Sequence, residues 1–411
     1  MIRLVAKANA ILLVQYAAGS LIPLLLVPHI VRSIGIEQFG QLAVALAWAG
    51  YGSLVAQYAF PLTGPQRLAG SPAAAGPTVL AETTATKFLL LLLVLPAMAA
   101  LALFQGTGGS IGIAALVVSV LVPTGTAMNS AWFLQAQGRF SWVCIASIIG
   151  ACTALGLGWF QVTGSDAGSV VGAAIALSFG TLFVGAATLV SAFRLAGPGP
   201  RVRVARARPF ELMRQDLPLF ASQMISALYT LSGPIVIDQL AGAAAAGRYG
   251  AIERIVNALV AACLLTHVAA YPRLAQLYVS DRPRYWTLLK IVIASYLAVA
   301  GTLAAGLWLF RVQVTGFVLG ANGADAHALL AWGLAWLVVG IFGSALTGYL
   351  AVSDRRQRVM PLTMQVLAAC VLVGVPAVAV FGPAGWMAAL VCSQSIVVFK
   401  ARREWMDRDA P

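Results

Sequence analysis

Charged side chains are scarce in this sequence. Only 9% of its 411 residues are Asp, Glu, Lys or Arg, whereas 60% are hydrophobic. Soluble domains carry about 25% charged residues, so the composition excludes a water-soluble globular protein. Helices satisfy their own backbone hydrogen bonds in lipid, and the long apolar runs therefore predict an all-α polytopic membrane protein.

Residues that bind metals or perform catalysis are also few. Three histidines and thirteen acids, mostly in separate loops, form no metal-binding pattern, and HExxH, P-loop and CxxC motifs are absent from the sequence. The five cysteines lie inside apolar runs without metal or disulfide spacing, as small core residues do. We therefore predict no enzyme activity, no metal and no cofactor. Without an ATPase motif, transport would depend on an H+ or Na+ gradient, the membrane potential or substrate supply.

The chain contains twelve apolar runs. A helix needs about 20 apolar residues to cross the hydrocarbon core, and the last run is the shortest. The runs are approximately 10–31, 40–62, 84–104, 111–133, 142–162, 169–193, 217–239, 248–271, 287–310, 327–350, 360–381 and 384–400.

Positive charge is in excess, with a net charge of +13. Lys and Arg gather in cytoplasmic connections of membrane proteins, so we predict no nucleic-acid partner. Placing both termini and every second connection on one side puts 22 of the 26 basic residues there, and leaves Arg32, Arg248, Arg254 and Arg311 elsewhere. Both termini are therefore predicted to be cytoplasmic, and the basic residues there to touch membrane lipids.

The longest basic connection, residues 194–216, lies at the middle of the chain. It predicts a cytoplasmic linker between an N-terminal six-helix lobe (1–193) and a C-terminal six-helix lobe with a short basic tail (217–411). The segment from Gly35 to Gly40 resembles that from Gly242 to Gly247 at an offset of 207 residues. Six spans per repeat return the chain to the same side, so the lobes would be parallel repeats about a pseudo-two-fold axis along the membrane normal.

Arg32 and Asp238 lie at the ends of the first and seventh predicted spans, at nearly corresponding positions of the two halves. A charge at a helix centre costs about 2.5–3.5 kcal/mol. Each residue therefore either anchors its helix at the interface or faces a central cavity. Lys87 is expected to extend to the cytoplasmic interface, and Asp216 to cap the seventh span ahead of Pro218.

The eighth span carries a polar stripe of Glu253, Arg254, Asn257 and His267. At about 100° per residue, the Glu, Asn and His positions fall within about 80° of arc, with Arg254 beside them. Such a stripe is costly against lipid, so we expect it to face a cavity, with Glu253 and Arg254 forming either a structural or a functional pair. Gln57, in the second span, is typical of an interhelical hydrogen bond.

Six segments of the sequence together resemble a known family. The segments PHIVRSIGIEQFG (28–40), YAFPLTGPQRLA (58–69), WFLQAQGRF (132–140), LFASQMISALYTLSGPIVID (219–238), AGRYGAIERIVNAL (246–259) and AAYPRLAQL (269–277) are similar, in order, to Wzx-type O-antigen and polysaccharide flippases. Ala59 stands where the family usually has glycine. Gln57 stands where an acid is often found, which argues against a titrating carboxylate in the second span.

The resemblance implies the fold of the multidrug/oligosaccharidyl-lipid/polysaccharide (MOP) superfamily, with two lobes in a V around a central cavity. It implies that undecaprenyl-diphosphate-linked oligosaccharide moves from the inner to the outer leaflet of the bacterial inner membrane, for O-antigen, capsule or exopolysaccharide assembly. A polymerase and a chain-length regulator of the same pathway are further expected partners.

Alternating access is the mechanism we expect for such a carrier. Arg32 and Arg254 would bind the diphosphate, Glu253 would hold Arg254 in the empty state, and Arg32 would pair with Asp238 to close an outer gate. Gln57 and Asn257 would line the cavity.

Two other functions remain open. A cation-coupled multidrug (MATE-like) exporter would need acidic and aromatic cavity residues. A membrane polymerase or glycosyltransferase would need a large outer loop with catalytic residues, whereas the longest one here, 311–326, has only Arg311 and Asp325 as charged residues.

Overall fold

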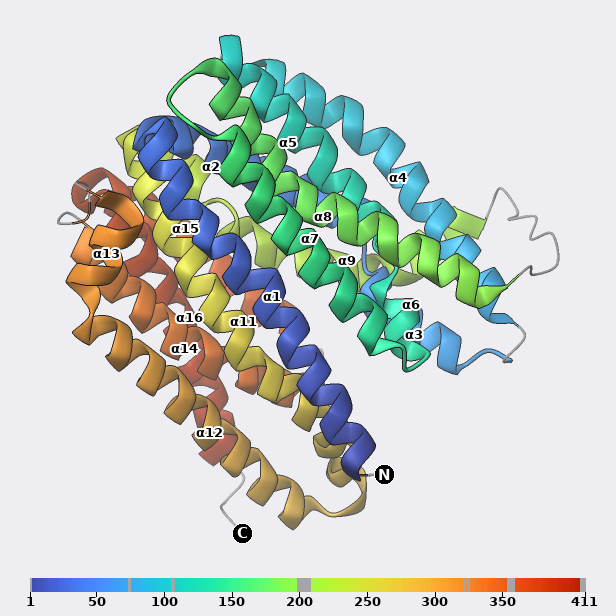
Figure 1. Ribbon diagram of the computed structural model, residues 1–411. Helices are drawn as coiled ribbons and strands as arrows, with labels where there is room; N and C mark the ends of the chain where they lie inside the picture. Colours follow the sequence, from blue (N-terminus) through green and yellow to red (C-terminus); the bar gives the residue numbers. More distant parts are fainter. Residues whose placement is uncertain are drawn as a thin grey trace. The chain divides into compact units, whose positions relative to one another are not determined.

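A computed structural model describes residues 2–72, 75–104, 108–197, 208–320, 323, 326–352 and 359–406, with some side chains in these ranges left undescribed. Every regular element in these ranges is a helix (Figure 1). Ten of them are long and apolar enough to cross a membrane. Each of the twelve predicted spans overlaps a helix, and the prediction of an all-α polytopic protein is confirmed.

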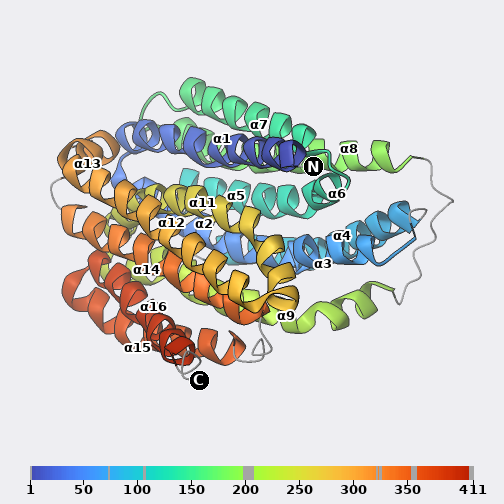
Figure 2. The ribbon, with the colours of Figure 1, turned by 90° about the horizontal axis from the view of Figure 1, so that it is seen from below.

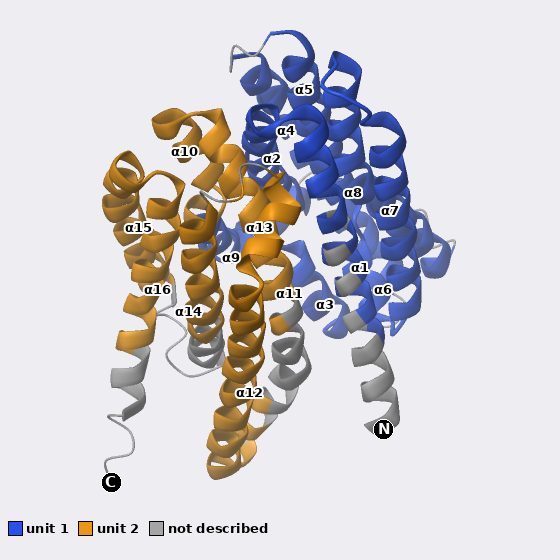
Figure 3. Cartoon of the chain, turned by 60° about the vertical axis from the view of Figure 1, so that its left-hand side comes forward, with its two compact units in different colours: residues 1–227 blue, residues 228–411 orange. Residues whose placement is uncertain are grey.

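The chain forms two compact units, residues 1–227 and 228–411 (Figure 3). Unit 1 contains α1 (Ile2–Ile34), α2 (Ile36–Gln57), α3 (Phe60–Ala69), α4 (Gly76–Phe104), α5 (Gly109–Met128), α6 (Ala131–Ala136), α7 (Phe140–Gln161), α8 (Ala167–Ala196) and most of α9 (Arg208–Thr230). Unit 2 contains α10 (Gly233–Ala241), α11 (Ala243–Ser280), α12 (Arg282–Leu309), α13 (Arg311–Leu319), α14 (His327–Val352), α15 (Val359–Phe381) and α16 (Pro383–Met406).

Within unit 1, α5 packs on both α4 and α8, and α7 packs on both α1 and α8 (Figures 1 and 2). Glycine allows the closest of these approaches. A Cβ atom on Gly185 of α8 would collide with the backbone carbonyl of Gly125 on α5, and one on Gly125 would lie 2.6 Å from the Leu182 backbone. Small residues let membrane helices meet backbone to backbone, which replaces the missing hydrophobic drive between helices in lipid.

Within unit 2, α16 packs on α14 and α15, and α11 packs on α12 and α14. The stretch 311–326, predicted to be an outer loop, contains the helix α13. Arg311 opens this helix, donates a hydrogen bond to the Trp308 carbonyl at 3.1 Å and lies over the Trp308 ring.

Gly35 and Gly242, which the sequence comparison paired, have the same backbone conformation. Their φ and ψ angles are 87° and 160° for Gly35, and 84° and 166° for Gly242. Each amide donates to a carbonyl four residues earlier, that of Val31 or Asp238. Residues with a side chain rarely adopt a positive φ, whereas glycine does so without steric cost, so glycine suits both turns. The paired turns agree with the predicted repeat, while the predicted lobe boundaries stay a prediction.

Replacing Gly185 by Ala is expected to force α5 and α8 apart. Overpacking a close-packed interior costs about 1–3 kcal/mol, and we expect an equivalent loss of unfolding free energy in mixed micelles. Gly156→Ala is the matched control, because a Cβ atom there meets nothing within 4 Å. Equal stability of the two variants would contradict the proposed close approach.

Candidate functional site

The N-terminal candidates, Arg32 and Gln57, lie at helix ends in unit 1. Arg32 is exposed in the last turn of α1, where a cation is favoured by the helix dipole. Gln57 is the last residue of α2 and is half-buried. Tyr58 follows it with a φ of 54°, a conformation uncommon outside glycine. Both candidates therefore stand beside interruptions of the helices.

Three C-terminal candidates lie on α11 in unit 2. Ile252 and Val256 are fully buried on the face that meets Gly333 of α14. At about 100° per residue, Glu253 lies at the flank of that face, whereas Arg254 and Asn257 point away from it. Glu253 and Arg254 are half-buried and interact electrostatically, and Asn257 is exposed. The side chain of His267 lies outside the described residues.

Asp238 is half-buried on α10. The predicted gate would join it to Arg32, and the predicted diphosphate site would join Arg32 to Arg254. In each case the two residues belong to separately described units. Both arrangements stay predictions.

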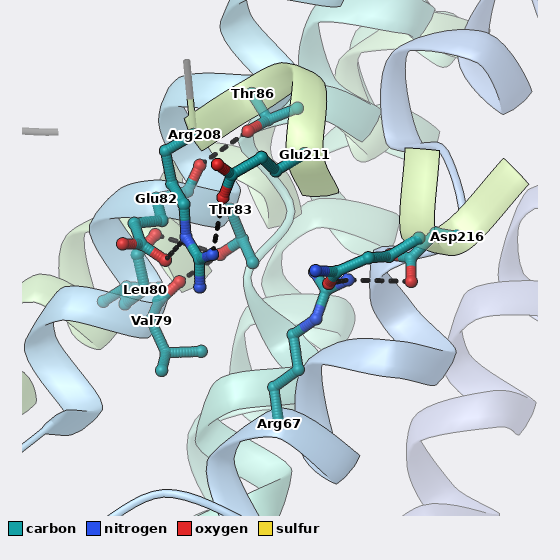
Figure 4. A network of polar contacts seen from close by, with 10 residues as sticks. Arg67, Val79, Leu80, Glu82, Thr83, Thr86, Arg208, Glu211 and Asp216 are labelled. Carbon is teal, nitrogen blue, oxygen red and sulfur yellow. Dashed lines mark hydrogen bonds and ion pairs between the residues drawn. The ribbon is translucent and has the colours of Figure 1, made fainter. Parts of the chain in front are cut away.

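An ion pair joins α3 and α9 and was not predicted from the sequence (Figure 4). Arg67 Nη2 lies 2.8 Å from Asp216 Oδ1, and the Thr63 hydroxyl donates to Asp216 Oδ2 at 2.8 Å. Asp216 is 5% exposed and lies inside α9, which begins at Arg208. Its predicted role as the cap of the seventh span is therefore wrong.

A second set of contacts holds the start of α9 to α4. Arg208 contacts Glu82 and Glu211 at 3.0 Å each (Figure 4). Farther along α9, the Tyr58 hydroxyl donates to the Met213 carbonyl at 2.9 Å, and its ring stacks on Phe220. These contacts place most of α9 with unit 1, although nine of its residues, 208–216, fall in the predicted linker.

Lys87 does not reach the interface, so that prediction was also wrong. Its side chain is 1% exposed, and Nζ donates to the Asn129 carbonyl at 2.7 Å. Asn129 caps the C-terminal end of α5. A cation there satisfies a carbonyl that the helix leaves unpaired.

A family model described as "Polysaccharide biosynthesis protein" matches residues 4–278. The chain belongs to this family. The matched range contains all six predicted site residues, and the resemblance to Wzx-type flippases is confirmed at the level of the family.

The chain is similar to two proteins named "Putative O-antigen transporter". The one from Shigella dysenteriae is 23% identical over 76% of this chain and 78% of its own length. The one from Escherichia coli K12 is 24% identical over 70% of this chain and 69% of its own length.

Solved structures of membrane transporters resemble this family member. The lipid II flippase MurJ in its inward closed conformation matches with a TM-score of 0.74 over 99% of this chain and 88% of its own, at 11% identity. An inward-facing MATE transporter of the MOP superfamily matches with a TM-score of 0.67 over 98% of this chain and 94% of its own, at 15% identity. At these identities the likeness shows the fold, which confirms the expected MOP architecture.

Removing one partner of the Arg67–Asp216 pair is expected to destabilise the protein. Breaking a buried pair leaves an uncompensated charge and costs about 3–5 kcal/mol, so Asp216→Asn should lower the unfolding free energy by about 3 kcal/mol. The control is Arg284→Ala, whose pair with Asp281 is exposed and is worth about 0–1 kcal/mol. Equal unfolding free energies for the two variants would contradict the importance of the α3–α9 pair.

Proposed function

We propose that this protein moves undecaprenyl-diphosphate-linked oligosaccharide from the inner to the outer leaflet of the bacterial inner membrane by alternating access. The product would feed O-antigen, capsule or exopolysaccharide assembly. The family match over residues 4–278 carries the proposal. The names of the two bacterial relatives and the fold shared with a lipid II flippase support it.

The diphosphate defines the charge that the carrier must bind. An attraction between unit charges at 4 Å is worth about 4 kcal/mol at an effective dielectric constant of 20. Arg32 and Arg254 are the cations proposed for this task. Arg254 has Glu253 as its neighbour, and the carboxylate would hold the guanidinium until phosphate replaces it.

The membrane potential can drive the export of such a cargo. Moving one elementary charge across 100 mV is worth about 2.3 kcal/mol, and a diphosphate of charge near −2 leaving a negative interior gains roughly twice that. Coupling to H+ or Na+ is therefore not required energetically. Both termini would lie in the cytoplasm, with a polymerase and a chain-length regulator as partners in the pathway.

A cation-coupled multidrug exporter is the second candidate, favoured by the fold shared with MATE transporters. Such an exporter would need acids free to meet a cationic drug. Among the described residues, Glu82, Glu211, Asp216 and Asp281 each pair with an arginine. These four acids are therefore not available to a cationic drug, and an exporter would have to use others, such as Glu37 or Asp238.

Deleting the gene is expected to trap the cargo on the cytoplasmic side. Undecaprenyl-diphosphate-linked oligosaccharide should accumulate several-fold while surface polysaccharide falls, and the wild-type gene should reverse both effects. Mass spectrometry of extracted lipids measures the accumulation. Normal lipid-linked intermediates together with increased sensitivity to cationic drugs would support the exporter instead.

Replacing both proposed phosphate ligands tests the mechanism. Arg32→Ala with Arg254→Ala should lower surface polysaccharide at least tenfold, because a tenfold change corresponds to only about 1.4 kcal/mol, well below the attraction estimated above. Membrane insertion, measured by immunoblot of membrane fractions, should be normal. Arg311→Ala is the control, since this arginine contacts Trp308 on its own segment. Full activity of the double variant would overturn the diphosphate assignment.

A further inference from the structure

A cavity of about 350 Å³ lies inside unit 1. It is bounded by α1, α7, α8 and the residue that follows α5. Its volume falls at the lower end of the range of small-molecule sites, about 300–1,000 Å³. Six polar residues line it, together with Gly, Ala, Leu and Val: Gln15, Tyr16, Ser20, Asn129, Ser147 and Thr181.

The cavity adjoins an interruption in a helical span. Residues 129–130 separate α5 from α6 within the candidate span Gly109–Ala136. The freed backbone groups find partners in side chains: Ala131 N donates to Asn129 Oδ1 at 2.9 Å, and Ser130 N donates to Thr188 Oγ1 at 3.2 Å. Non-helical backbone at membrane depth is tolerated where it is buried or lines a cavity. Transporters typically build binding sites at such interrupted helices.

The lining has hydrogen-bonding capacity left over. Gln15 Oε1 is buried with no hydrogen-bond partner. The Asn129 side-chain oxygen is used by Ala131, which leaves its amide NH₂ group to donate. The Ser147 hydroxyl donates to the Val143 carbonyl, so its oxygen can still accept. A ligand for this cavity must therefore both donate and accept.

The lining of the cavity favours an uncharged ligand. No lining residue is an acid or a base. Behind the lining, Lys87 Nζ lies 2.7 Å from the Asn129 carbonyl oxygen, and in the described residues no carboxylate lies within ion-pair distance of it. With no carboxylate in the lining, nothing there compensates the charge of a metal ion or a cationic drug. An uncharged ligand with several hydroxyl groups satisfies both the charge and the hydrogen-bonding requirements.

We propose that this cavity binds one sugar ring of the glycan, separately from the residues assigned to the diphosphate. The assignment rests on the proposed function, because it takes the ligand to be part of the lipid-linked cargo. The polar side chains would exchange hydrogen bonds with the sugar hydroxyls. The small residues of α7 and α8 leave the space that the ring occupies.

Saturation-transfer NMR on the full-length protein in nanodiscs tests the site without the natural cargo. The probes are the methyl glycosides of glucose, galactose, mannose, rhamnose and N-acetylglucosamine, with choline as the cationic comparison. We expect saturation transfer to at least one glycoside and none to choline. Gly19→Leu should reduce the signal at least threefold, because Gly19 lines the cavity and a side chain there meets nothing within 4 Å.

Gly156→Leu is the matched control, since it also adds a side chain in open space on a helix but lies outside the lining. Thr181→Val should weaken binding of the glycoside, whereas Thr153→Val, at a half-buried position of α7 outside the lining, should not. No transfer to any glycoside, equal signals in all variants, or transfer to choline alone would overturn the sugar site and leave a water-filled cavity or a cation site. The gene-deletion lipid analysis is independent, so failure of the sugar site and failure of the flippase assignment can be told apart.

Discussion

The constraint on which the structure depends is that lipid offers no hydrogen bonds to the backbone. Each interruption of a helix must therefore bring its own partners. At Gly35 and Gly242 a single glycine with positive φ makes the turn, and the next helix begins at once. After α5 the turn is longer, and the side chains of Lys87, Asn129 and Thr188 supply the partners. Polar groups thus concentrate at interruptions, and the proposed sugar site is adjacent to one of them.

Polar contacts of α9 also accompany the end of unit 1. By sequence, α9 opens the second half of the chain, yet several of its polar contacts are made to helices of the first half. Arg67 pairs with Asp216, and the hydroxyl groups of Tyr58 and Tyr51 donate to the carbonyls of Met213 and Ala227. These contacts extend along α9 to the residue at which unit 1 ends. The chain consequently passes from unit 1 to unit 2 inside α9.

Hydropathy and glycine spacing were enough to predict the long apolar helices and the paired turns, because both are local properties of the chain. The partners of charged residues are not local. Lys87 lies near the end of an apolar run, which resembles an interfacial position, but its acceptor is 42 residues away. Arg67 and Asp216 are 149 residues apart, and neither position shows a pattern that links them. Arg32 and Asp238 occupy corresponding positions in the two halves of the sequence. Such a correspondence predicts equivalent positions in the two repeats, but it does not predict that the two side chains contact each other.

Charge balance connects the fold to the choice of cargo. In the described part of unit 1, Glu82 and Asp216 are each matched by an arginine. Lys87 donates to the carbonyl of Asn129 at the end of α5, where the partial negative charge of a helix end favours a cation. Neither Glu82 nor Asp216 is free to meet a cationic drug, which fits the proposed carrier of diphosphate-linked glycans better than an exporter of cations.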